Sequence, residues 1–408
     1  MILIRIYMVH QIRYLVLGLL LCTVGYFSYR TYLYYFNTVA PDVTVVGVQD
    51  NAYYAGQIKG VVKGSSPYKV ANLSILLDDK VVQENIPIHK KKFEYPISLD
   101  TQDIIDGKHS ITFAVTDSSK NQNKTCLQKS LGIDNQSLQA TIVSHDQDHK
   151  VLQGRCLRVQ FQTNKPTASA TVQTLHSKYN CFPKSPNSLV YEAIVPLDCE
   201  QAAQEYPFSI DIKDYVGNSV LLEDKFQVVG VPFKKKILHV QNNKLKSELE
   251  FTSLQERDLE QALEKISQNS VKQKLWTGAF DVPLLMTGTS TEFGVIRTSQ
   301  ERGRTVHRAV DLVAEPRAVV WAAQNGIVVL KDRYTHSGNT VVLDHGHGVV
   351  SMYFHLHDFA DIEVGQKVKK GNPLGRMGMT GFANGHHLHW EIRVNNLAVD
   401  PMQWTQLS

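Results

Sequence analysis

The most apolar stretch of the chain lies at its N-terminus. Arg5 and Arg13 precede the uncharged residues 14–29, and Arg30 follows them before a tyrosine-rich run. About 20 apolar residues span a bilayer, and positive residues favour its cytoplasmic side. We therefore predict that residues 1–38 form a cytoplasmic tip and a single-pass transmembrane anchor in the inner or cytoplasmic membrane, with the rest of the chain on the periplasm or cell-wall side.

A cleaved signal peptide is the alternative for this segment. Signal peptides end in a small-residue cleavage site, and the best match here, Thr38-Val39-Ala40, is followed by Pro41. Cys22 is preceded by Leu21 and not by a small residue, which argues against a bacterial lipid anchor. The pattern favours the transmembrane anchor over cleavage.

Short segments rich in β-branched residues follow, and several alternate apolar and polar positions as strands with one buried face do. Twice a strand ends in Asp, a polar turn containing Asn follows, and another strand begins, at residues 113–124 and 210–222. This pattern resembles the last hairpin of bacterial immunoglobulin-like domains. We predict two immunoglobulin-like β-sandwiches, residues 39–132 and 133–231, which space or present another domain.

Residues 232–275 begin with a basic, linker-like stretch and then show a helical period. We predict a helix over residues 253–270, where Ser253 and Glu256 match a capping box. Its apolar positions are Leu254, Leu259, Leu263 and Ile266. A helix of this length is too short for a long coiled coil, so we expect it to pack against its neighbours.

Residues 276–408 return to strand-like segments joined by turns that contain glycine, such as Asn325-Gly326 and Ser337-Gly338. This pattern predicts a mostly antiparallel β domain. The predicted fold class is mainly β: an antiparallel β-sheet domain preceded by two immunoglobulin-like β-sandwiches and an N-terminal transmembrane helix.

The composition of the whole chain narrows the function. The 408 residues are 43 % hydrophobic and 20 % charged, which is ordinary for globular domains. The formal net charge of +4 is too small to indicate nucleic-acid binding, and we expect no nucleic-acid partner.

Four cysteines follow the apolar segment. They are Cys126, Cys156, Cys181 and Cys199. In an oxidising compartment they can pair in three ways, between which the sequence does not choose, and free buried thiols are the alternative. None lies in a CxxC pair, so we reject a cysteine zinc site.

Histidines gather in the last quarter of the chain, where nine of the sixteen follow residue 306. His387 and His389 are two positions apart, so in a strand they share a face. His307 and Asp311 are four apart and also share a face if the backbone is extended. Two imidazoles and a carboxylate are a suitable three-ligand set for zinc, with a fourth position left for water. This arrangement is typical of catalytic zinc sites.

Several ordered motifs strengthen this interpretation. They include FGVIRTSQERGRTVHRAVDL, GNTVVLDHGHG, MYFHL, VGQKVKKGNPLG and GMTGFANGHHLHWEI. Together they resemble the lysostaphin-type zinc metallopeptidases, also called the LytM family, over about residues 276–404. The resemblance implies an antiparallel β fold with a groove and endopeptidase activity on the peptides of bacterial cell walls. It identifies residues 276–408 as a zinc metallopeptidase domain, which we expect to fold and act without the rest of the chain.

The resemblance also assigns roles to five residues. His307, Asp311 and His389 match the ligands of one catalytic Zn²⁺, and His355 and His387 match two catalytic histidines that do not bind the metal. The family usually has Gly where Ala309 stands and Pro where His386 stands. Neither departure removes a ligand. Glu391, two positions after His389, is either a partner of that ligand or simply a strand residue on the same face.

These features predict a membrane-anchored extracytoplasmic zinc endopeptidase that hydrolyses peptide bonds in bacterial peptidoglycan. The predicted partners are peptidoglycan peptides and, through the N-terminal helix, the membrane. One alternative is a non-catalytic LytM-like regulator of cell-wall hydrolases, but relatives of that kind lack zinc ligands. The other is a wall-binding protein, which leaves the histidine cluster unexplained.

Overall fold

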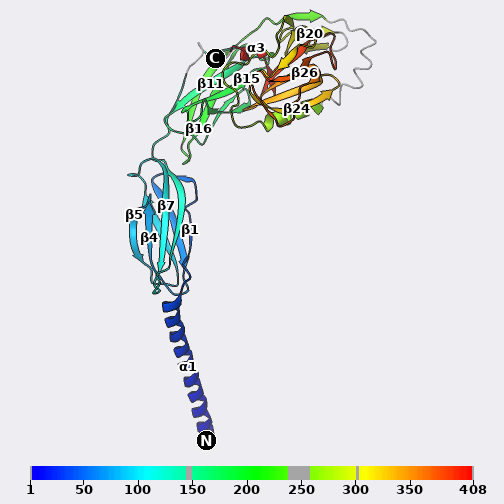
Figure 1. The fold of residues 1–408 in the computed structure, drawn as a ribbon. Helices are drawn as coiled ribbons and strands as arrows, with labels where there is room; N and C mark the ends of the chain where they lie inside the picture. The colour runs from blue at the N-terminus through cyan, green and yellow to red at the C-terminus, as the bar shows by residue number, and fades with distance from the viewer. Residues whose placement is uncertain (1, 144–148, 238–257, 300–302, 407–408) are drawn as a thin grey trace. The chain divides into compact units, whose positions relative to one another are not determined.

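The protein divides into two compact units in a computed structural model. The structure describes residues 2–143, 149–237, 258–299 and 303–406. Unit 1 comprises residues 1–138 and 213–219, and unit 2 comprises residues 139–212 and 220–408. The described chain is mainly β with one long N-terminal helix, as the sequence predicts (Figure 1).

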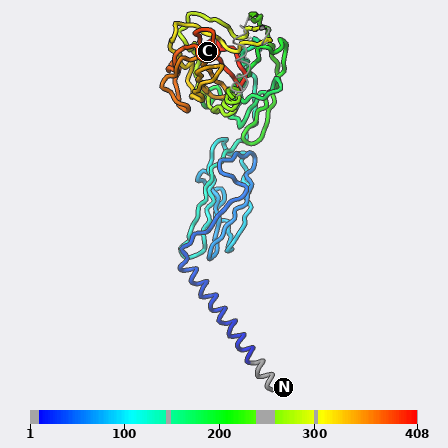
Figure 2. The backbone as a smooth tube through the Cα atoms, turned by 90° about the vertical axis from the view of Figure 1, so that its right-hand side faces the viewer, coloured from blue at the N-terminus to red at the C-terminus, as the bar shows by residue number. Residues whose placement is uncertain are grey.

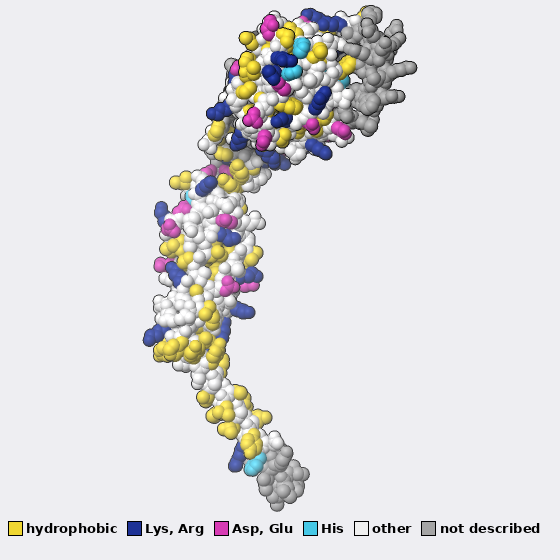
Figure 3. Space-filling view, turned by 45° about the vertical axis from the view of Figure 1, so that its right-hand side comes forward, with side chains coloured by type: hydrophobic (Ala, Val, Ile, Leu, Met, Phe, Trp, Pro, Cys, Tyr) yellow, Lys and Arg dark blue, Asp and Glu magenta, His cyan; other side chains and the backbone are white. Residues whose placement is uncertain are grey.

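Unit 1 begins with helix α1, Ile2–Phe36. Within α1, the segment His10–Phe36 is long and apolar enough to cross a membrane. A signal sequence can have the same length and composition. None of the apolar segment is buried inside the protein. Apolar side chains cover much of this part (Figure 3), and in Figure 2 the trace of α1 leads directly into the first β segment. Just after the helix, Asn37 Nδ2 donates a hydrogen bond to Asp117 Oδ2 at 2.7 Å.

Two sheets follow in unit 1. One has the strand order β1-β3-β6, with β1 Asp42–Val46, β3 Gln57–Ser65 and β6 Lys92–Asp100. The other has the order β2-β8-β7-β4-β5, with β2 Ala52–Tyr54, β4 Val70–Leu77, β5 Lys80–Pro87, β7 Gly107–Asp117 and β8 Lys124–Ile133. Their inner side chains, among them Ile58, Val62, Leu73 and Phe113, form one apolar core. The first predicted sandwich is therefore a two-sheet β structure.

Unit 2 contains two further sheets in its first part. One has the order β14-β15-β11-β9, with β9 Ala140–Ile142, β11 Cys156–Thr163, β14 Phe182–Pro183 and β15 Val190–Pro196. The other has the order β10-β17-β16-β12-β13, with β10 Lys150–Leu152, β12 Ser169–Thr174, β13 Ser177–Asn180, β16 Glu205–Lys213 and β17 Ser219–Val229. These sheets are called the second sandwich below. The immunoglobulin-like class of both sandwiches stays a prediction.

The repeated Asp-and-Asn pattern marks equivalent hairpins. In the β7–β8 turn, Asn123 donates from its backbone N to Asp117 Oδ1 and from Nδ2 to Oδ2, both at 3.0 Å. In the β16–β17 turn, Asn218 makes the same pair of bonds to Asp214, at 2.8 and 2.9 Å. The carboxylate in each turn accepts hydrogen bonds from turn groups that have no partner in the strand pairing. The same need in both hairpins explains why the Asp-and-Asn pattern occurs twice.

The cysteines carry free thiols in the structure. Cys156 and Cys199 are buried in an apolar cluster, whereas Cys126 is exposed. Burial raises the pKa of the Cys181 and Cys199 thiols to about 12. Burial also raises the pKa of Cys156, so these two buried thiols and the half-buried Cys181 thiol are protonated at neutral pH.

The C-terminal part of unit 2 is built on an antiparallel ten-stranded sheet. Its main order is β19-β22-β29-β26-β25-β24-β27, and β23, β28 and β30 pair beside this path. The bounds are β19 Gly288–Thr291, β22 Val310–Val313, β23 Val319–Trp321, β24 Gly326–Tyr334, β25 Gly338–Gly346, β26 Val349–Phe359, β27 Lys367–Val368, β28 Pro373–Met377, β29 Leu388–Val394 and β30 Leu397–Val399. The predicted antiparallel β domain is confirmed, and it ends in the short helix α3, Pro401–Trp404.

A small second sheet and a helix complete this part. The sheet has the order β18-β20-β21, with β18 Lys235–Ile237, β20 Ile296–Ser299 and β21 Gly303–Val306. Residues 258–268 are helical, and Leu259 and Leu263 are buried against the large sheet, as the apolar stripe predicts. The predicted cap at Ser253 and Glu256 lies outside the described residues.

The second sandwich and the C-terminal sheet share one core within unit 2, and their traces lie side by side in Figures 1 and 2. The shared cluster includes Cys156, Phe182, Ile194 and Cys199 from the sandwich and Trp276, Phe280, Phe293 and Trp404 from the C-terminal part. The Gln403 side chain accepts from Cys156 N at 2.7 Å and donates to Cys156 O at 2.9 Å. Lys274 Nζ lies 2.6 Å from the buried Glu192 carboxylate. The predicted boundary between residues 133–231 and 276–408 therefore crosses a packed interior.

Candidate metal centre

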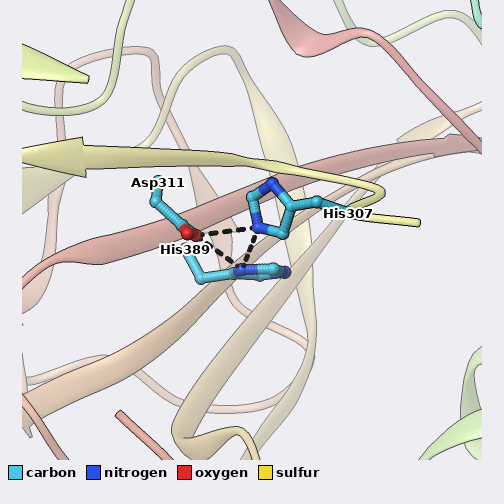
Figure 4. Close-up of side chains that lie close together, drawn as sticks. All are labelled: His307, Asp311 and His389. Atoms are coloured by element: carbon cyan, nitrogen blue, oxygen red, sulfur yellow. Dashed lines mark hydrogen bonds and ion pairs between the residues drawn. The ribbon is translucent and has the colours of Figure 1, made fainter. Parts of the chain in front are cut away.

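Asp311 and His389 face each other across two neighbouring strands. Asp311 lies on β22 and His389 on β29, and the two are direct partners in the antiparallel register. Side chains opposite each other in such a pair project from the same face of the sheet. His389 Nδ1 lies 2.9 Å from Asp311 Oδ1 (Figure 4).

His307 reaches the same carboxylate from a connection between two sheets. It follows β21, which belongs to the three-stranded sheet, and precedes β22 of the ten-stranded sheet. The extended path predicted from His307 to Asp311 is therefore interrupted. The side chains still meet, with His307 Nε2 3.0 Å from Asp311 Oδ1 and 3.4 Å from His389 Nδ1.

The chemistry of these atoms fits a cation. Among the described residues, one ligand atom from each of His307, Asp311 and His389 lies within 4.8 Å of the others. His307 Nδ1 is 3.1 Å from the carbonyl oxygen of Glu292, so it carries the ring hydrogen of a neutral imidazole. The Nε2 lone pair then faces a carboxylate oxygen and another imidazole nitrogen. Three electron-pair donors converge in this way only if a proton or a metal ion lies among them, and two nitrogens with one carboxylate oxygen suit Zn²⁺.

Burial increases the need for a positive charge among these three side chains. His307 and Asp311 are 5 % and 6 % exposed. Burial lowers the pKa of His307 and works to raise that of Asp311, but hydrogen bonds with the two histidines outweigh this effect and hold the pKa of Asp311 well below its usual range. Asp311 therefore stays ionised and supplies the negative charge of the cluster.

Arg297 also contacts the cluster, which sequence reasoning missed. Its guanidinium donates a 3.3 Å hydrogen bond to Asp311 Oδ2 and leaves Oδ1 to the histidines. Arg297 lies on β20, fourteen positions earlier and in a different sheet. The periodicity of either strand carries no sign of this pairing, because it depends on how the two sheets meet.

His355 lies beside the cluster in an unusual backbone conformation. Its φ of 61° is in the left-handed region, which a side chain with a Cβ seldom adopts and which is enriched at functional sites. Its Nδ1 is 2.8 Å from Thr380 O, so Nδ1 carries the hydrogen and Nε2 the lone pair of the neutral ring. Burial, with the neighbouring rings of His389 and His387, lowers the pKa of His355 to about 3.

His387 lies next to His355, with 4.8 Å between the ring centroids. Its Nδ1 is 2.9 Å from Gly385 O, and its Nε2 is 3.8 Å from Asp311 Oδ1. The structure thus brings all five predicted site residues together. It leaves His386 exposed, while His345 is fully buried away from the cluster between Asn325 O and Ser351 Oγ.

The match to a family model points to the same part of the chain, and relatives and solved structures are similar to it in part. Residues 305–401 match the model of peptidase family M23. The DD-carboxypeptidase/endopeptidase Mpg of Neisseria meningitidis serogroup B is 33 % identical over 126 residues, which cover 31 % of this chain and 29 % of that protein. The peptidoglycan DD-endopeptidase ShyC of Vibrio cholerae is 32 % identical over 120 residues, 29 % of this chain and 28 % of that one. The chain thus aligns with less than a third of the length of these relatives.

Among solved structures, the catalytic domain of the antimicrobial peptidase lysostaphin from Staphylococcus simulans is similar at 26 % identity and a TM-score of 0.24, over 35 % of this chain and 97 % of that one. The match to the family model begins two residues before His307 and includes Asp311, His355, His387 and His389. The C-terminal part of this chain is therefore a domain of peptidase family M23.

Proposed function

We propose that this chain is a membrane-anchored extracytoplasmic zinc endopeptidase that hydrolyses peptide bonds in bacterial peptidoglycan. The observation that carries the proposal is the convergence of His307 Nε2, Asp311 Oδ1 and His389 Nδ1, each a metal-ligand atom, within hydrogen-bond distance of one another. The family match and the names of the relatives, which include a peptidoglycan DD-endopeptidase, support the substrate class.

The site residues have distinct tasks in this proposal. His307, Asp311 and His389 would hold Zn²⁺. When bound, zinc polarises the scissile carbonyl and lowers the pKa of an attacking water toward about 7.

His355 and His387 supply the proton transfer. Each donates its Nδ1 hydrogen to a backbone carbonyl, of Thr380 and of Gly385, which leaves the lone pair of the neutral ring on Nε2. One such nitrogen takes the proton of the attacking water, and a protonated ring gives a proton to the leaving amine. The carbonyl partners hold both rings in the required tautomer.

The remaining parts of the chain place this chemistry. Helix α1 has the length and composition of a single membrane span, which would keep the enzyme at the membrane and the M23 domain on the outer side. We propose that the first sandwich is a spacer. The second sandwich shares a core with the M23 domain and so also supports the catalytic part.

Release of soluble fragments from purified peptidoglycan tests the proposed function. We expect the full chain in detergent to release peptide-containing fragments, a metal chelator to stop the release, and added Zn²⁺ to restore it. Release that continues in a chelator known to have removed all metal would refute zinc catalysis. Binding to peptidoglycan without cleavage by the zinc-loaded protein would favour a wall-binding protein.

A further inference from the structure

The side of His389 that faces away from the cluster is lined by a buried carboxylate. His389 directs Nδ1 toward Asp311, so its Nε2 points the other way, where Glu391 Oε2 lies 3.8 Å distant. Glu391 is two positions further along β29 and is 4 % exposed. A carboxylate near Nε2 favours the tautomer with the hydrogen on Nε2 and the lone pair on Nδ1, which is the form that binds a metal through Nδ1.

Glu391 is itself held by an arginine. Arg393 Nε lies 2.5 Å from Glu391 Oε1, and the Arg393 side chain is 12 % exposed. A buried carboxylate is costly unless a cation is paired with it in good geometry. Arg393 therefore compensates the charge of Glu391 and holds this side chain in place beside His389.

The other end of Arg393 is bound by the helix of residues 258–268. Glu260 on this helix accepts from both terminal nitrogens of Arg393, from Nη1 to Oε2 at 2.6 Å and from Nη2 to Oε1 at 2.8 Å. Such a two-pronged pair fixes the plane of the guanidinium as well as its position. The helix lies more than thirty residues before the segment that matches the M23 family model.

The same helix also supports His389 through apolar contacts. Leu259 and Leu263 belong to a buried cluster that includes Val350, Met352 and Phe354. The Phe354 ring lies parallel to the His389 ring, with 5.3 Å between centroids and 4° between planes. Two separate routes, one polar and one apolar, thus connect one helix to one ligand.

We propose that the helix of residues 258–268 is a positioning element of the metal centre. Glu260 fixes Arg393, Arg393 fixes Glu391, and Glu391 fixes His389 in the orientation and tautomer that present Nδ1 to the cation. This inference rests on the proposed zinc function. It makes Glu260, Glu391 and Arg393 positioning residues, which act on metal affinity without touching the substrate.

Zinc affinity tests this chain of contacts directly. The full chain in detergent is titrated with Zn²⁺ against a chromophoric chelator. We expect Glu391→Gln to weaken zinc binding by about 10- to 100-fold, the usual effect of losing a partner of a ligand, and Glu260→Ala by about threefold to tenfold because its action is indirect. The matched control is Glu264→Ala, one turn further along the same helix, where the side chain accepts from Gln268 and from no other described residue. Its affinity should equal that of the parent.

A double variant distinguishes this route from a general loss of helix packing. If Glu260 acts through Glu391, adding Glu260→Ala to Glu391→Gln should weaken zinc binding no further. Equal affinities for Glu260→Ala, Glu264→Ala and the parent would overturn the inference and leave the proposed zinc function intact, and so would fully additive effects in the double variant. A parent that binds no zinc would overturn both.

Discussion

At the residue scale, a backbone carbonyl beside three of the four site imidazoles decides which nitrogen faces the site. His307, His355 and His387 all place Nδ1 against a carbonyl oxygen and so present Nε2, whereas His389 presents Nδ1. His307 and His389 direct these nitrogens at Asp311 Oδ1, at 3.0 and 2.9 Å. Among the described residues, the His355 ring makes a hydrogen bond only to the Thr380 carbonyl, and its centroid is 5.9 Å from that of the His389 ring. This local geometry fits the proposed division of metal binding and proton transfer between different rings.

Removing the His355 imidazole should separate these two tasks. We expect His355→Ala to keep zinc and lower the rate of peptidoglycan cleavage by about a hundredfold or more, the usual contribution of a proton-transfer group. Because His355 has a positive φ, His355→Asn is the better-tolerated companion variant, since Asn adopts this conformation more readily than Ala. Zinc content and cleavage rate are measured on the same preparation.

The control for this prediction is His386→Ala, which removes an exposed ring next to His387 and should leave both zinc content and rate unchanged. Loss of zinc from a folded His355 variant would place that residue among the ligands. Parent-like activity would remove it from the mechanism.

His345 should make the stability of unit 2 depend on pH. Burial lowers its pKa to about 4, against the 6.5 of an exposed histidine, while its Nδ1 faces Asn325 O and its Nε2 the Ser351 hydroxyl. Because the folded pKa is below the unfolded one, the unfolded chain takes up the proton first as the pH falls. Stability is then complete above about pH 6.5 and declines toward pH 4, by about 2 kcal/mol at pH 5 from this group.

Unfolding midpoints at pH 7 and pH 5 measure this contribution. His345→Gln should be less stable than the parent at pH 7, because the buried bonds change, but should lose less stability between the two pH values. The contribution of His347, whose pKa burial also lowers to about 4, remains in both proteins and cancels in the comparison. An identical pH dependence in parent and variant would show that His345 does not stay neutral in the fold.

At this scale the sequence predicts partners that are close along one strand and misses partners that are not. The two-residue spacing of His387 and His389 brings both rings to Asp311, as strand geometry requires. Arg297 and Glu260 reach the site from β20 and from the helix, 14 and 133 positions from their partners. Only the packing of those elements on the large sheet creates these contacts, and one sequence contains no periodic signal for it.

At the element scale, the site depends on how closely the strand β26 and the segment before β29 approach each other. Gly378 lies between them, pairs with His387, and has no room for a side chain: a Cβ there would lie 2.4 Å from His357 N and 2.8 Å from His355 O. Glycine is therefore required at position 378 because a Cβ would clash with neighbouring backbone atoms. A left-handed backbone is not the reason, since the φ of Gly378 is not positive.

Gly378→Ala should consequently displace the two proposed catalytic histidines while leaving the ligands in place. We expect zinc to be retained and the cleavage rate to fall by about tenfold to a hundredfold, because a shift near 1 Å in reacting groups has effects of that size. Gly385→Ala is the matched control, since a Cβ at that position meets nothing within 4 Å and the carbonyl that accepts from His387 is unchanged. Equal rates for the two variants would contradict this steric account.

Helices and strands were predictable where the apolar positions repeated with a clear period. The elements against which they pack or pair were not predictable. The stripe that includes Leu259 and Leu263 predicts a packed helix, and these residues are buried. The four-residue spacing of His307 and Asp311 predicts one extended segment, yet the chain leaves one sheet and enters another between them. Alternation along a strand reports which face is buried, but it does not say which sheet the strand joins.

At the scale of the whole molecule, the decisive feature is the interior that the second sandwich shares with the M23 domain. Phe182 of the sandwich stacks on His347 at 3.7 Å between centroids and packs edge-on against Trp276 at 6.3 Å. Asp198 and Glu200 of the sandwich also pair with Arg308, the residue after the predicted ligand His307. The sequence shows strands in both parts but no sign that their cores merge, because every strand is apolar on one face whichever partner covers it.

The positions of the motifs alone predict that residues 276–408 fold and act without the rest of the chain. The shared interior leads to a different expectation. Residues 276–408 contain every predicted catalytic residue, but they omit the sandwich face that covers Trp276 and Trp404 and the helix that bears Glu260. Residues 139–408 retain both. Burying an aromatic side chain of this size contributes several kcal/mol, roughly 3 to 5 by truncation to Ala. We therefore expect the shorter fragment to be destabilised and aggregation-prone and the longer one to unfold cooperatively.

Thermal unfolding, zinc content and cleavage rate of the two fragments, compared with the full chain, decide between these expectations. A fragment of residues 276–408 that matched residues 139–408 in all three measurements would show that the second sandwich is only a spacer.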